Sequence, residues 1–339
     1  MSGEKGEWEM NKKQIAGILA AAFVFVFVCG ANILVKNAGQ AQKKAELAKS
    51  VLSSIGTQID LPSSPFVGVV KVDGTIMKTT SSALLPAEGY NHEKTLDLID
   101  QLQKSGENRG ILLYVNTPGG SVYETDELYQ RLLKYKKETG RPVWTYMGAE
   151  ACSGGYYVSM ASDKIYANRN TWTGSIGVIL SLSNYKGLMD KLGVDTVLFT
   201  SGPNKSMGNP GVEMTKEQSG IFQGLVDESY EQFVGIVAQG RKMSVETVKP
   251  IADGRIYTAQ QALDLKLIDG IQNYEDAQAQ MKKELGGNVT FFTPKSSEFN
   301  LNSLFSMAKS YTATDAEKVK ELLETQESGV PMYYANTGK

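Results

Sequence analysis

The chain has 339 residues, a net charge of −2, two cysteines and one histidine, His92. This length allows one large domain or two, and the near-neutral charge gives no reason to expect nucleic acid as a partner. A single histidine excludes zinc chemistry built on several histidines, and two cysteines disfavour a disulfide framework or a cysteine metal site. We therefore expect no metal and no cofactor, and we expect His92 at an exposed helix start.

An uncharged apolar stretch covers residues 15–35, after a polar segment over residues 1–14. At 1.5 Å per residue, a helix over this stretch is about 31 Å long, enough to cross a bilayer once. The alternatives are a cleaved signal peptide, whose apolar core is shorter, and a lipoprotein signal ending at Cys29. We predict a transmembrane anchor followed by a stalk over residues 36–65, in an orientation that the flanking lysines do not decide.

From residue 66 to 295, apolar runs of strand length alternate with amphipathic runs of helix length. The predicted strands are 67–72, 111–116, 143–147, 164–167, 178–182, 196–200 and 289–292, and the predicted helices are 93–104, 123–138, 185–192, 214–239, 245–251, 259–265 and 274–285. This alternation is typical of an α/β domain with helices packed against a largely parallel sheet. Residues 296–339 are polar and are predicted to form a loosely packed tail, although Met332–Ala335 is apolar enough to occupy a peptide groove.

A glycine-rich turn follows the predicted strand 143–147 and contains Ser153, in the sequence Gly-Ala-Glu-Ala-Cys-Ser-Gly-Gly-Tyr-Tyr. Its neighbours are small, so another backbone can approach the hydroxyl closely. The helix that follows would offer N–H groups to a developing negative charge, which suits a nucleophile. The alternative is that Ser153 is an ordinary helix N-cap.

Two further stretches can supply chemistry. In Asn-Thr-Pro-Gly-Gly-Ser, residues 116–121, the paired glycines leave backbone N–H groups free to bind an anion, or else they form a tight turn with Ser121 capping the next helix. In the loop 200–211, Lys205 is the only charged residue, and a solvated lysine is its ordinary interpretation. A serine without a histidine needs another base, however, and a lysine serves when it is neutral in a pocket away from carboxylates.

Four motifs occur in order along the chain: Asn-Thr-Pro-Gly-Gly at 116–120, Ala-Cys-Ser-Gly-Gly-Tyr-Tyr at 151–157, Thr-Gly-Ser-Ile-Gly-Val at 173–178 and Ala-Asp-Gly-Arg-Ile-Tyr at 252–257. Together they resemble the SppA family of signal peptide peptidases, in its shorter, single-repeat form from Gram-positive bacteria. That family is similar in fold to the Clp protease and crotonase superfamily. The resemblance covers roughly residues 66–290, and the predicted anchor agrees with it.

The resemblance implies a role for five residues. Ser153 would be the nucleophile and Lys205 the general base. Gly120 and the N–H of Gly154 would line an oxyanion hole, and Ser175 would orient the lysine amine. It also implies a homo-oligomer, in which the serine and the lysine of one site can come from neighbouring protomers, and a catalytic domain outside the cytoplasm.

Two positions depart from the family pattern. Cys152 stands where a small aliphatic residue is usual, and Glu150 places a carboxylate close to Ser153. A thiol nucleophile at Cys152 is disfavoured, because thiolate activation needs a nearby cation or base.

We thus predict a membrane-anchored Ser/Lys endopeptidase that degrades remnant signal peptides and other unfolded segments. One alternative is an acyl-CoA enzyme of the crotonase type, which would use carboxylates such as Glu124, Asp126 and Glu127 in the helix 123–138. The other is a membrane scaffold with an inactive site, since a fold alone does not fix function.

Overall fold

The apolar runs of the sequence form the strands of one sheet. A computed structural model describes residues 59–78, 89–294 and 332–334. The predicted anchor over residues 15–35 lies outside these ranges. Within them, no helix combines the length and the apolar character needed to cross a bilayer.

The sheet has eight strands, in the order β7-β6-β4-β2-β1-β9, with β5 paired to β4 and β8 paired to β5. Only β6 and β7 pair antiparallel among these eight; every other pairing is parallel. The bounds are β1 (Phe66–Asp73), β2 (Asn108–Thr117), β4 (Val143–Cys152), β5 (Lys164–Ala167), β6 (Trp172–Gly174), β7 (Ile256–Thr258), β8 (Gly270–Ile271) and β9 (Thr290–Phe292). The central strands are buried along most of their length, as expected for parallel strands covered on both faces.

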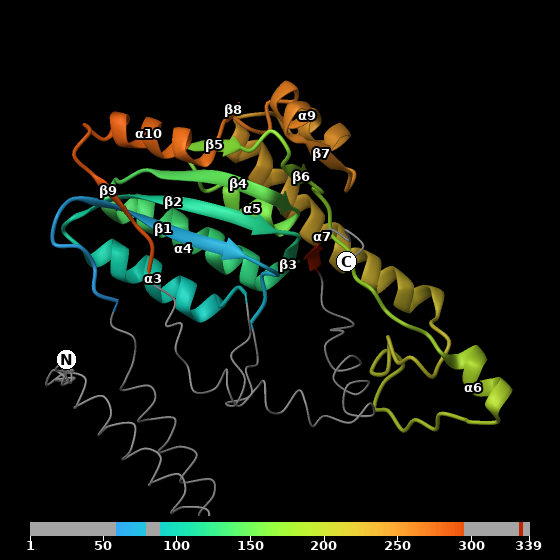
Figure 1. Cartoon of the computed structure of the whole chain (residues 1–339). Helices are drawn as coiled ribbons and strands as arrows, with labels where there is room; N and C mark the ends of the chain where they lie inside the picture. Colours follow the sequence, from blue (N-terminus) through green and yellow to red (C-terminus); the bar gives the residue numbers. More distant parts are fainter. Residues whose placement is uncertain (1–58, 79–88, 295–331, 335–339) are drawn as a thin grey trace, which may run out of the picture. The chain divides into compact units, whose positions relative to one another are not determined.

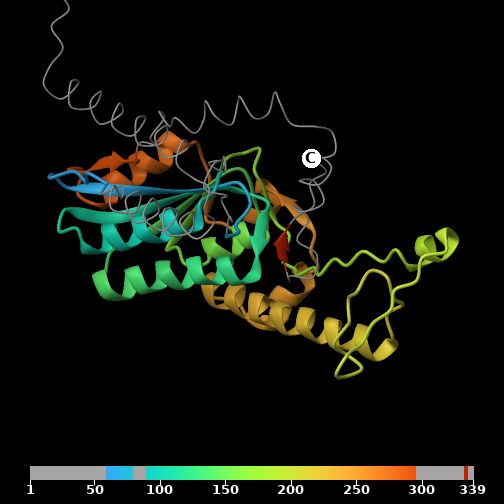
Figure 2. The ribbon, with the colours of Figure 1, turned by 90° about the horizontal axis from the view of Figure 1, so that it is seen from below.

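Helices cover both faces of this sheet. On one face lie α3 (His92–Lys104) and α4 (Val122–Thr139), which Figure 2 shows from below. On the other face lies α10 (Tyr274–Glu284), whose Ala277 and Met281 join Trp144 and Tyr146 of β4 in one apolar cluster (Figure 1). The remaining helices are α5 (Gly154–Ser159), α6 (Lys186–Leu192), α7 (Lys216–Arg241), α8 (Val245–Val248), the short 3-10 helix η1 (Lys249–Ile251) and α9 (Ala259–Asp264). The predicted α/β fold with a mostly parallel sheet flanked by helices is confirmed.

Local sequence determines where α7 and α9 begin. Each starts with a capping box, formed by Thr215 with Gln218 and by Thr258 with Gln261. In both boxes the threonine side chain accepts from a backbone N–H and the glutamine side chain accepts in return from the threonine N–H. The spacing of Thr258 and Gln261, three residues apart, is the sequence pattern of a capping box, so the start of α9 is predictable.

The prediction of strands at residues 178–182 and 196–200 is wrong. These residues belong to a segment without regular strands, residues 178–213, which we call the arm; it carries α6 and leaves the sheet after β6 (Figures 1 and 2). Val197 is 73% exposed and Phe199 is 96% exposed. Their β-forming side chains favour a strand only where a neighbouring strand packs against them, and none of the strands in the described residues lies beside this segment.

The prediction of a loosely packed tail is wrong at the described residues 332–334. They form β10 (Met332–Tyr334), which pairs antiparallel with β3 (Gly119–Ser121), a short strand between β2 and α4. The side chain of Tyr333 is 0% exposed. A strand of mostly glycine presents little but main chain, so another segment can pack closely on it.

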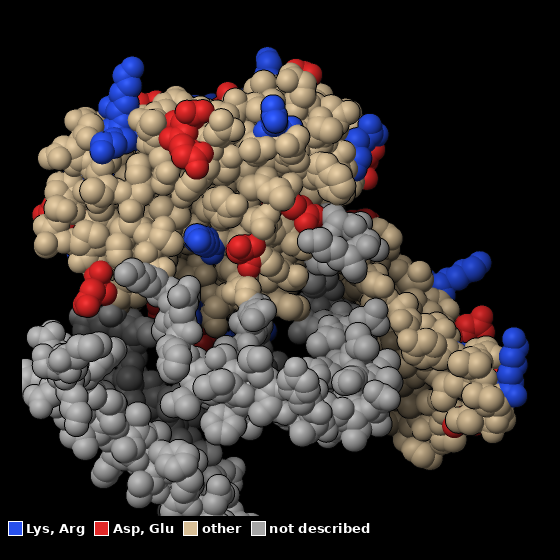
Figure 3. All heavy atoms as spheres, viewed as in Figure 1, with Lys and Arg blue, Asp and Glu red and all other residues tan. Residues whose placement is uncertain are grey.

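Charged side chains of both signs are interspersed on the face seen in Figure 3. This face offers no extended basic stripe of the kind that nucleic-acid binding requires.

Candidate active site

A strained turn joins β4 to α5 and holds Ser153. Ser153 has φ 51° and ψ −112°, a backbone conformation that L residues rarely adopt. Such a conformation costs on the order of 1–3 kcal/mol and persists only where its surroundings enforce it. Sharp strand-to-helix turns of this kind present a nucleophile at the carboxyl end of a sheet.

The pairing of β4 with two different strands holds this turn in place. Residues Trp144–Met147 of β4 pair with β5, whereas Glu150–Cys152 pair with β6. The N–H of Ser153 then donates to the carbonyl of Gly174, the last residue of β6, over 2.7 Å. Ser153 is thereby held at the carboxyl end of β4, where sheets of this class place ligands.

The hydroxyl of Ser153 is buried and unpartnered. Ser153 is 1% exposed, and its Oγ has no hydrogen-bond partner among the described residues. A buried hydroxyl without a partner costs free energy, so native proteins seldom keep one without a use for it. Ser153 occupies the N-cap position of α5, but its side chain makes no capping hydrogen bond, so it does not act as an ordinary side-chain cap.

Three glycines bring two backbones together beside this turn. A Cβ added at Gly154 would lie 3.2 Å from the amide nitrogen of Gly120 and 3.2 Å from the Cα of Gly119. Gly119 has φ 111°, and its N–H donates to Thr117 Oγ1 over 3.0 Å, which fixes the turn after β2. The N–H groups of Gly120 and Gly154, the two predicted oxyanion donors, therefore lie close together.

The direction of the Gly120 N–H follows from its neighbours. Ile76 donates to the carbonyl of Gly119 over 2.8 Å and accepts from the N–H of Ser121 over 2.8 Å. Backbone groups alternate in direction along a strand, so the N–H of Gly120 faces away from Ile76. Two N–H groups that converge on one point can stabilise an oxyanion.

Within a single copy of the chain, the side chain of Lys205 does not contact the hydroxyl of Ser153. Lys205 lies in the arm and is exposed, and its amine forms no hydrogen bond with the Ser153 or Ser175 hydroxyl. Ser175 is buried with φ 49°, and its N–H donates to the carbonyl of Arg255 over 2.8 Å. The structure thus brings together Ser153, Gly120 and Gly154, and within one chain leaves the lysine out.

Cys152 is unsuited to act as a nucleophile. Its thiol is buried, and burial, with a smaller effect of the Glu150 carboxylate, raises its pKa from 9.0 to about 12. The thiol is therefore protonated at neutral pH, and only the thiolate is a good nucleophile.

The prediction that His92 is exposed is wrong. His92 is 3% exposed; its Nδ1 lies 2.7 Å from the hydroxyl of Tyr90, and its Nε2 lies 2.9 Å from Oε2 of Glu127. Both ring nitrogens are therefore engaged, and the imidazole ties α3 to α4. No triad between His92 and Ser153 exists in the described chain.

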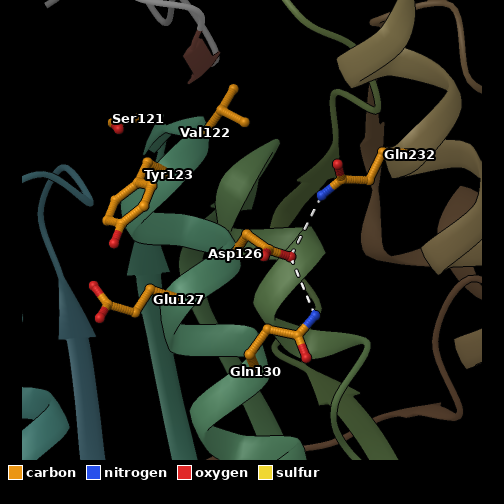
Figure 4. A pocket seen from close by; sticks show the side chains of 7 residues that line it. All are labelled: Ser121, Val122, Tyr123, Asp126, Glu127, Gln130 and Gln232. Carbon is orange, nitrogen blue, oxygen red and sulfur yellow. Dashed lines mark hydrogen bonds between the residues drawn. The ribbon is translucent and has the colours of Figure 1, made fainter.

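The carboxylates of α4 are also engaged by protein groups. Glu124 accepts a hydrogen bond from Ser121, and Glu127 contacts His92. Asp126 accepts from the hydroxyl of Tyr157 over 2.7 Å. Figure 4 shows Asp126 and Glu127 at a pocket of about 540 Å³, where Gln130 and Gln232 also bond to Asp126.

Comparison with known proteins places these features in a family. The family model of peptidase family S49 matches residues 135–288, and that of Clp protease matches residues 86–173. An Enterococcus faecium protein named as a signal peptide peptidase SppA is 43% identical over 63% of this chain and 62% of its own length. The chain therefore spans less than two thirds of that relative.

Two more relatives extend the comparison. A Methanocaldococcus jannaschii protein named as a protease is 32% identical over 78% of this chain and 81% of its own length. Protease 4 of Haemophilus influenzae is 31% identical over 62% of this chain but only 33% of its own length. On the strength of these matches, the chain belongs to peptidase family S49.

Proposed function

We propose that the chain is a serine endopeptidase with Ser153 as its nucleophile. The observation that carries this proposal is the Ser153 hydroxyl, which is buried and unpartnered among the described residues at a strained turn, where the backbones of Gly120 and Gly154 lie close together. A free hydroxyl next to two backbone donors is the arrangement that acyl transfer needs.

The reaction then follows from this geometry. A base removes the proton from Ser153 Oγ as the oxygen attacks the carbonyl carbon of the scissile bond. The N–H groups of Gly120 and Gly154 stabilise the negative charge that develops on the carbonyl oxygen. The base passes its proton to the leaving amine, and water then releases the acyl group from Ser153.

We propose Lys205 of a neighbouring copy of the chain as the base. Within one described chain, His92 and the α4 carboxylates are occupied by other contacts, and the Ser153 hydroxyl has no partner. A lysine works as a base only in its neutral form, which a dry pocket between two chains would favour. Ser175, which precedes the arm in the sequence, is proposed to orient the incoming amine.

The exposed apolar surface of the arm supports this arrangement. Eight large apolar side chains of the arm are exposed: Ile179, Tyr185, Leu188, Leu192, Val194, Val197, Leu198 and Phe199. Monomeric proteins rarely display so many apolar side chains in one stretch, and a second copy of the chain is a partner that would bury them. The same contact would carry Lys205 to the neighbouring site.

We propose that the substrates are remnant signal peptides and other unfolded segments. The name of the Enterococcus faecium relative supports this substrate class. We further propose that residues 15–35 anchor the chain in the cell membrane, with the peptidase domain outside the cytoplasm. The crotonase alternative is less favoured, because the α4 carboxylates that it would use are bonded to protein groups.

Cleavage of a fluorogenic peptide by the detergent-solubilised full-length chain tests the proposal. Ser153→Ala and Lys205→Ala are each expected to lower kcat/KM by about a thousandfold or more, with an unchanged Tm. Lys191→Ala, which removes another lysine of the arm, is the matched control and is expected to stay within about twofold of the wild type. No cleavage by the wild-type chain, or full activity in the Ser153 variant, would contradict the proposal.

A further inference from the structure

The Ala-Asp-Gly-Arg-Ile-Tyr motif, residues 252–257, packs against the residues at the end of β6. Its last two residues belong to β7, which pairs with β6. The carbonyl of Arg255 accepts from the N–H of Ser175 over 2.8 Å. The N–H of Gly254 donates to the carbonyl of Ile176 over 3.0 Å. These contacts are made by the main chain, so backbone pairing does not require an arginine side chain here.

The side chain of Arg255 is bound to the carboxylate of Asp253. Its Nε donates to Oδ1 over 2.7 Å and to Oδ2 over 2.9 Å, and its Nη2 also donates to Oδ2. Gly254, between the two, has φ 86°, a conformation that favours glycine. The Arg255 side chain is 60% exposed and the Asp253 side chain 46%, and exposed ion pairs contribute little to the free energy of unfolding. Stability therefore gives little reason for this pair.

Asp253 and Ser175 line the same pocket, of about 500 Å³, which we call the Ser175 pocket. Its other ionisable groups come from α7. They are Asp227, which accepts from the amide of Gln223 over 2.6 Å, and Tyr230, whose pKa is raised mainly by burial. The apolar side chains of its wall are Val178, Ile179, Val226 and Ile256. An amine that bonds to Ser175 would lie in or beside this pocket, where the charges of its wall act on it.

The charge of Asp253 bears directly on such an amine. Hydrogen bonds from Arg255 lower the pKa of Asp253 from 3.8 to about 2, so this carboxylate is ionised at every pH at which an amine titrates. A carboxylate alone stabilises the protonated amine, which cannot act as a base. A carboxylate bound by a guanidinium carries little net charge, because the guanidinium stays protonated.

We propose that Arg255 is a positioning residue that acts through Asp253: it offsets the carboxylate charge at the Ser175 pocket, so that the lysine amine arriving from a neighbouring copy stays neutral. This inference rests on the proposed function and adds to it the group that sets the protonation state of the base. Asp227 remains as one carboxylate at the pocket, which makes a second one without its guanidinium costly for the base.

The pH dependence of peptide cleavage by the full-length chain tests this role. Arg255→Gln should raise the midpoint of the acidic limb of kcat/KM by about one pH unit, because it leaves the Asp253 charge without its cation. Asp253→Asn should lower that midpoint, and Asp253→Asn/Arg255→Gln should return it close to the wild-type value. Arg255→Lys keeps the charge and should also stay close to the wild type. A lower rate at every pH with an unmoved midpoint in Arg255→Gln would show a structural role and overturn the proposal.

Arg109 offers a matched control. It pairs with Glu107, also two residues away, and their side chains are 41% and 43% exposed. Because β2 runs parallel to β4, Arg109 near the beginning of β2 lies towards the opposite end of the sheet from Ser153. Arg109→Gln removes the same charge and should move the midpoint by less than about 0.2 pH units, since salt screens charges at this separation. Equal shifts in Arg109→Gln and Arg255→Gln would show a general effect of net charge and overturn the proposal.

Chemical labelling separates failure of this inference from failure of the proposed function. The full-length Ser153→Ala and Ser153→Ala/Arg255→Gln chains are pulsed with acetic anhydride over a series of pH values, and modification of Lys205 is measured by mass spectrometry. The midpoint pH for labelling of Lys205 should be about one unit higher in the second chain, with that of Lys191 unchanged. If the wild type cleaves no peptide but this difference appears, the proposed peptidase is wrong while the role of Arg255 stands. Equal midpoints overturn that role even if cleavage is observed.

Discussion

The N–H of Ser153 donates to the carbonyl of Gly174 over 2.7 Å, and this bond joins the strained turn to the end of β6. Ser175, the next residue after Gly174, also has a positive φ, 49°. Two serines in rare backbone conformations thus meet where β4 and β6 end. Strain of this kind gathers at functional sites, where rigid surroundings maintain it.

The strain at Ser153 predicts opposite effects of one substitution on stability and activity. Ser153→Gly is expected to raise the free energy of unfolding by about 1 kcal/mol relative to Ser153→Ala, because glycine adopts φ 51° freely. Both variants should be inactive. Urea unfolding of the two chains checks this, and an alanine variant that is as stable as the glycine variant would show that the turn is not strained.

Gly120 cannot accept a side chain. A Cβ there would lie 1.9 Å from the carbonyl oxygen of Ile76, so Gly120→Ala must displace β3 and with it one proposed oxyanion donor. We expect a loss in kcat of about a hundredfold or more. Gly235→Ala in α7, where a Cβ would meet nothing within 4 Å, is the control, and it should raise stability by up to about 1 kcal/mol with activity intact. Equal activity in the two variants would contradict the assignment.

The raised pKa of Cys152 predicts an inert thiol. In a Cys29→Ser background, which leaves Cys152 as the only cysteine, the folded chain should not react with iodoacetamide at pH 9 and should react once unfolded. Cys152→Ala should keep kcat/KM within about twofold of the wild type. Rapid labelling of the folded chain that abolishes activity would instead identify a thiol nucleophile.

The raised pKa of Cys152 also makes the free energy of unfolding depend on pH. The unfolded chain releases the Cys152 proton near pH 9, whereas the folded chain holds it to about pH 12. The unfolded state therefore binds fewer protons in this window, and the free energy of unfolding falls as the pH rises from 9 towards 12. Comparing denaturation midpoints of the wild type and Cys152→Ala at pH 8 and pH 10 isolates this effect. A parallel loss of stability in both chains would contradict the shift.

The arm predicts an assembly that one side chain can weaken. Phe199 is 96% exposed within one chain, so Phe199→Ser costs no core packing and should leave the far-UV circular dichroism spectrum unchanged. Removing its apolar surface from a contact between chains should reduce the mass measured by light scattering at micromolar concentration and lower kcat/KM about tenfold or more. Val245→Ser, an exposed apolar residue outside the arm, should do neither. A monomeric wild type would contradict the shared site.

Patterns of neighbouring residues in the sequence predict the strands, helices and turns that depend on short-range interactions. The strand before Ser153, the helix after it and the paired glycines at 119 and 120 all follow from short-range rules about turns and periodicity. That Ser153, Gly120 and Gly154 belong to one site follows instead from the family resemblance of the four motifs, because short-range rules do not bring residues from two separate turns together. Even so, β4 runs through to Cys152, beyond its predicted end at residue 147, because β6 pairs with its last residues.

What depends on distant partners is not predictable in this way. The apolar residues of the arm have the composition of strands, but the described chain provides no strand beside them. The apolar character of residues 332–335 suggests a place in a groove but does not identify the partners. Tyr333 is buried because Tyr157 and Phe233, far away in the sequence, pack against its ring. His92 is buried because Tyr90 and Glu127 satisfy both of its ring nitrogens, a contact that no local pattern indicates.

Mixing two inactive chains tests the central claim most directly. Ser153→Ala and Lys205→Ala chains with different tags are co-expressed at full length and purified through both tags in turn. If Lys205 of one copy activates Ser153 of another, the mixed assembly should recover about a quarter or more of wild-type activity, while each variant alone stays inactive. A mixed assembly that cleaves no peptide, although it contains both chains, would contradict a site shared between neighbours.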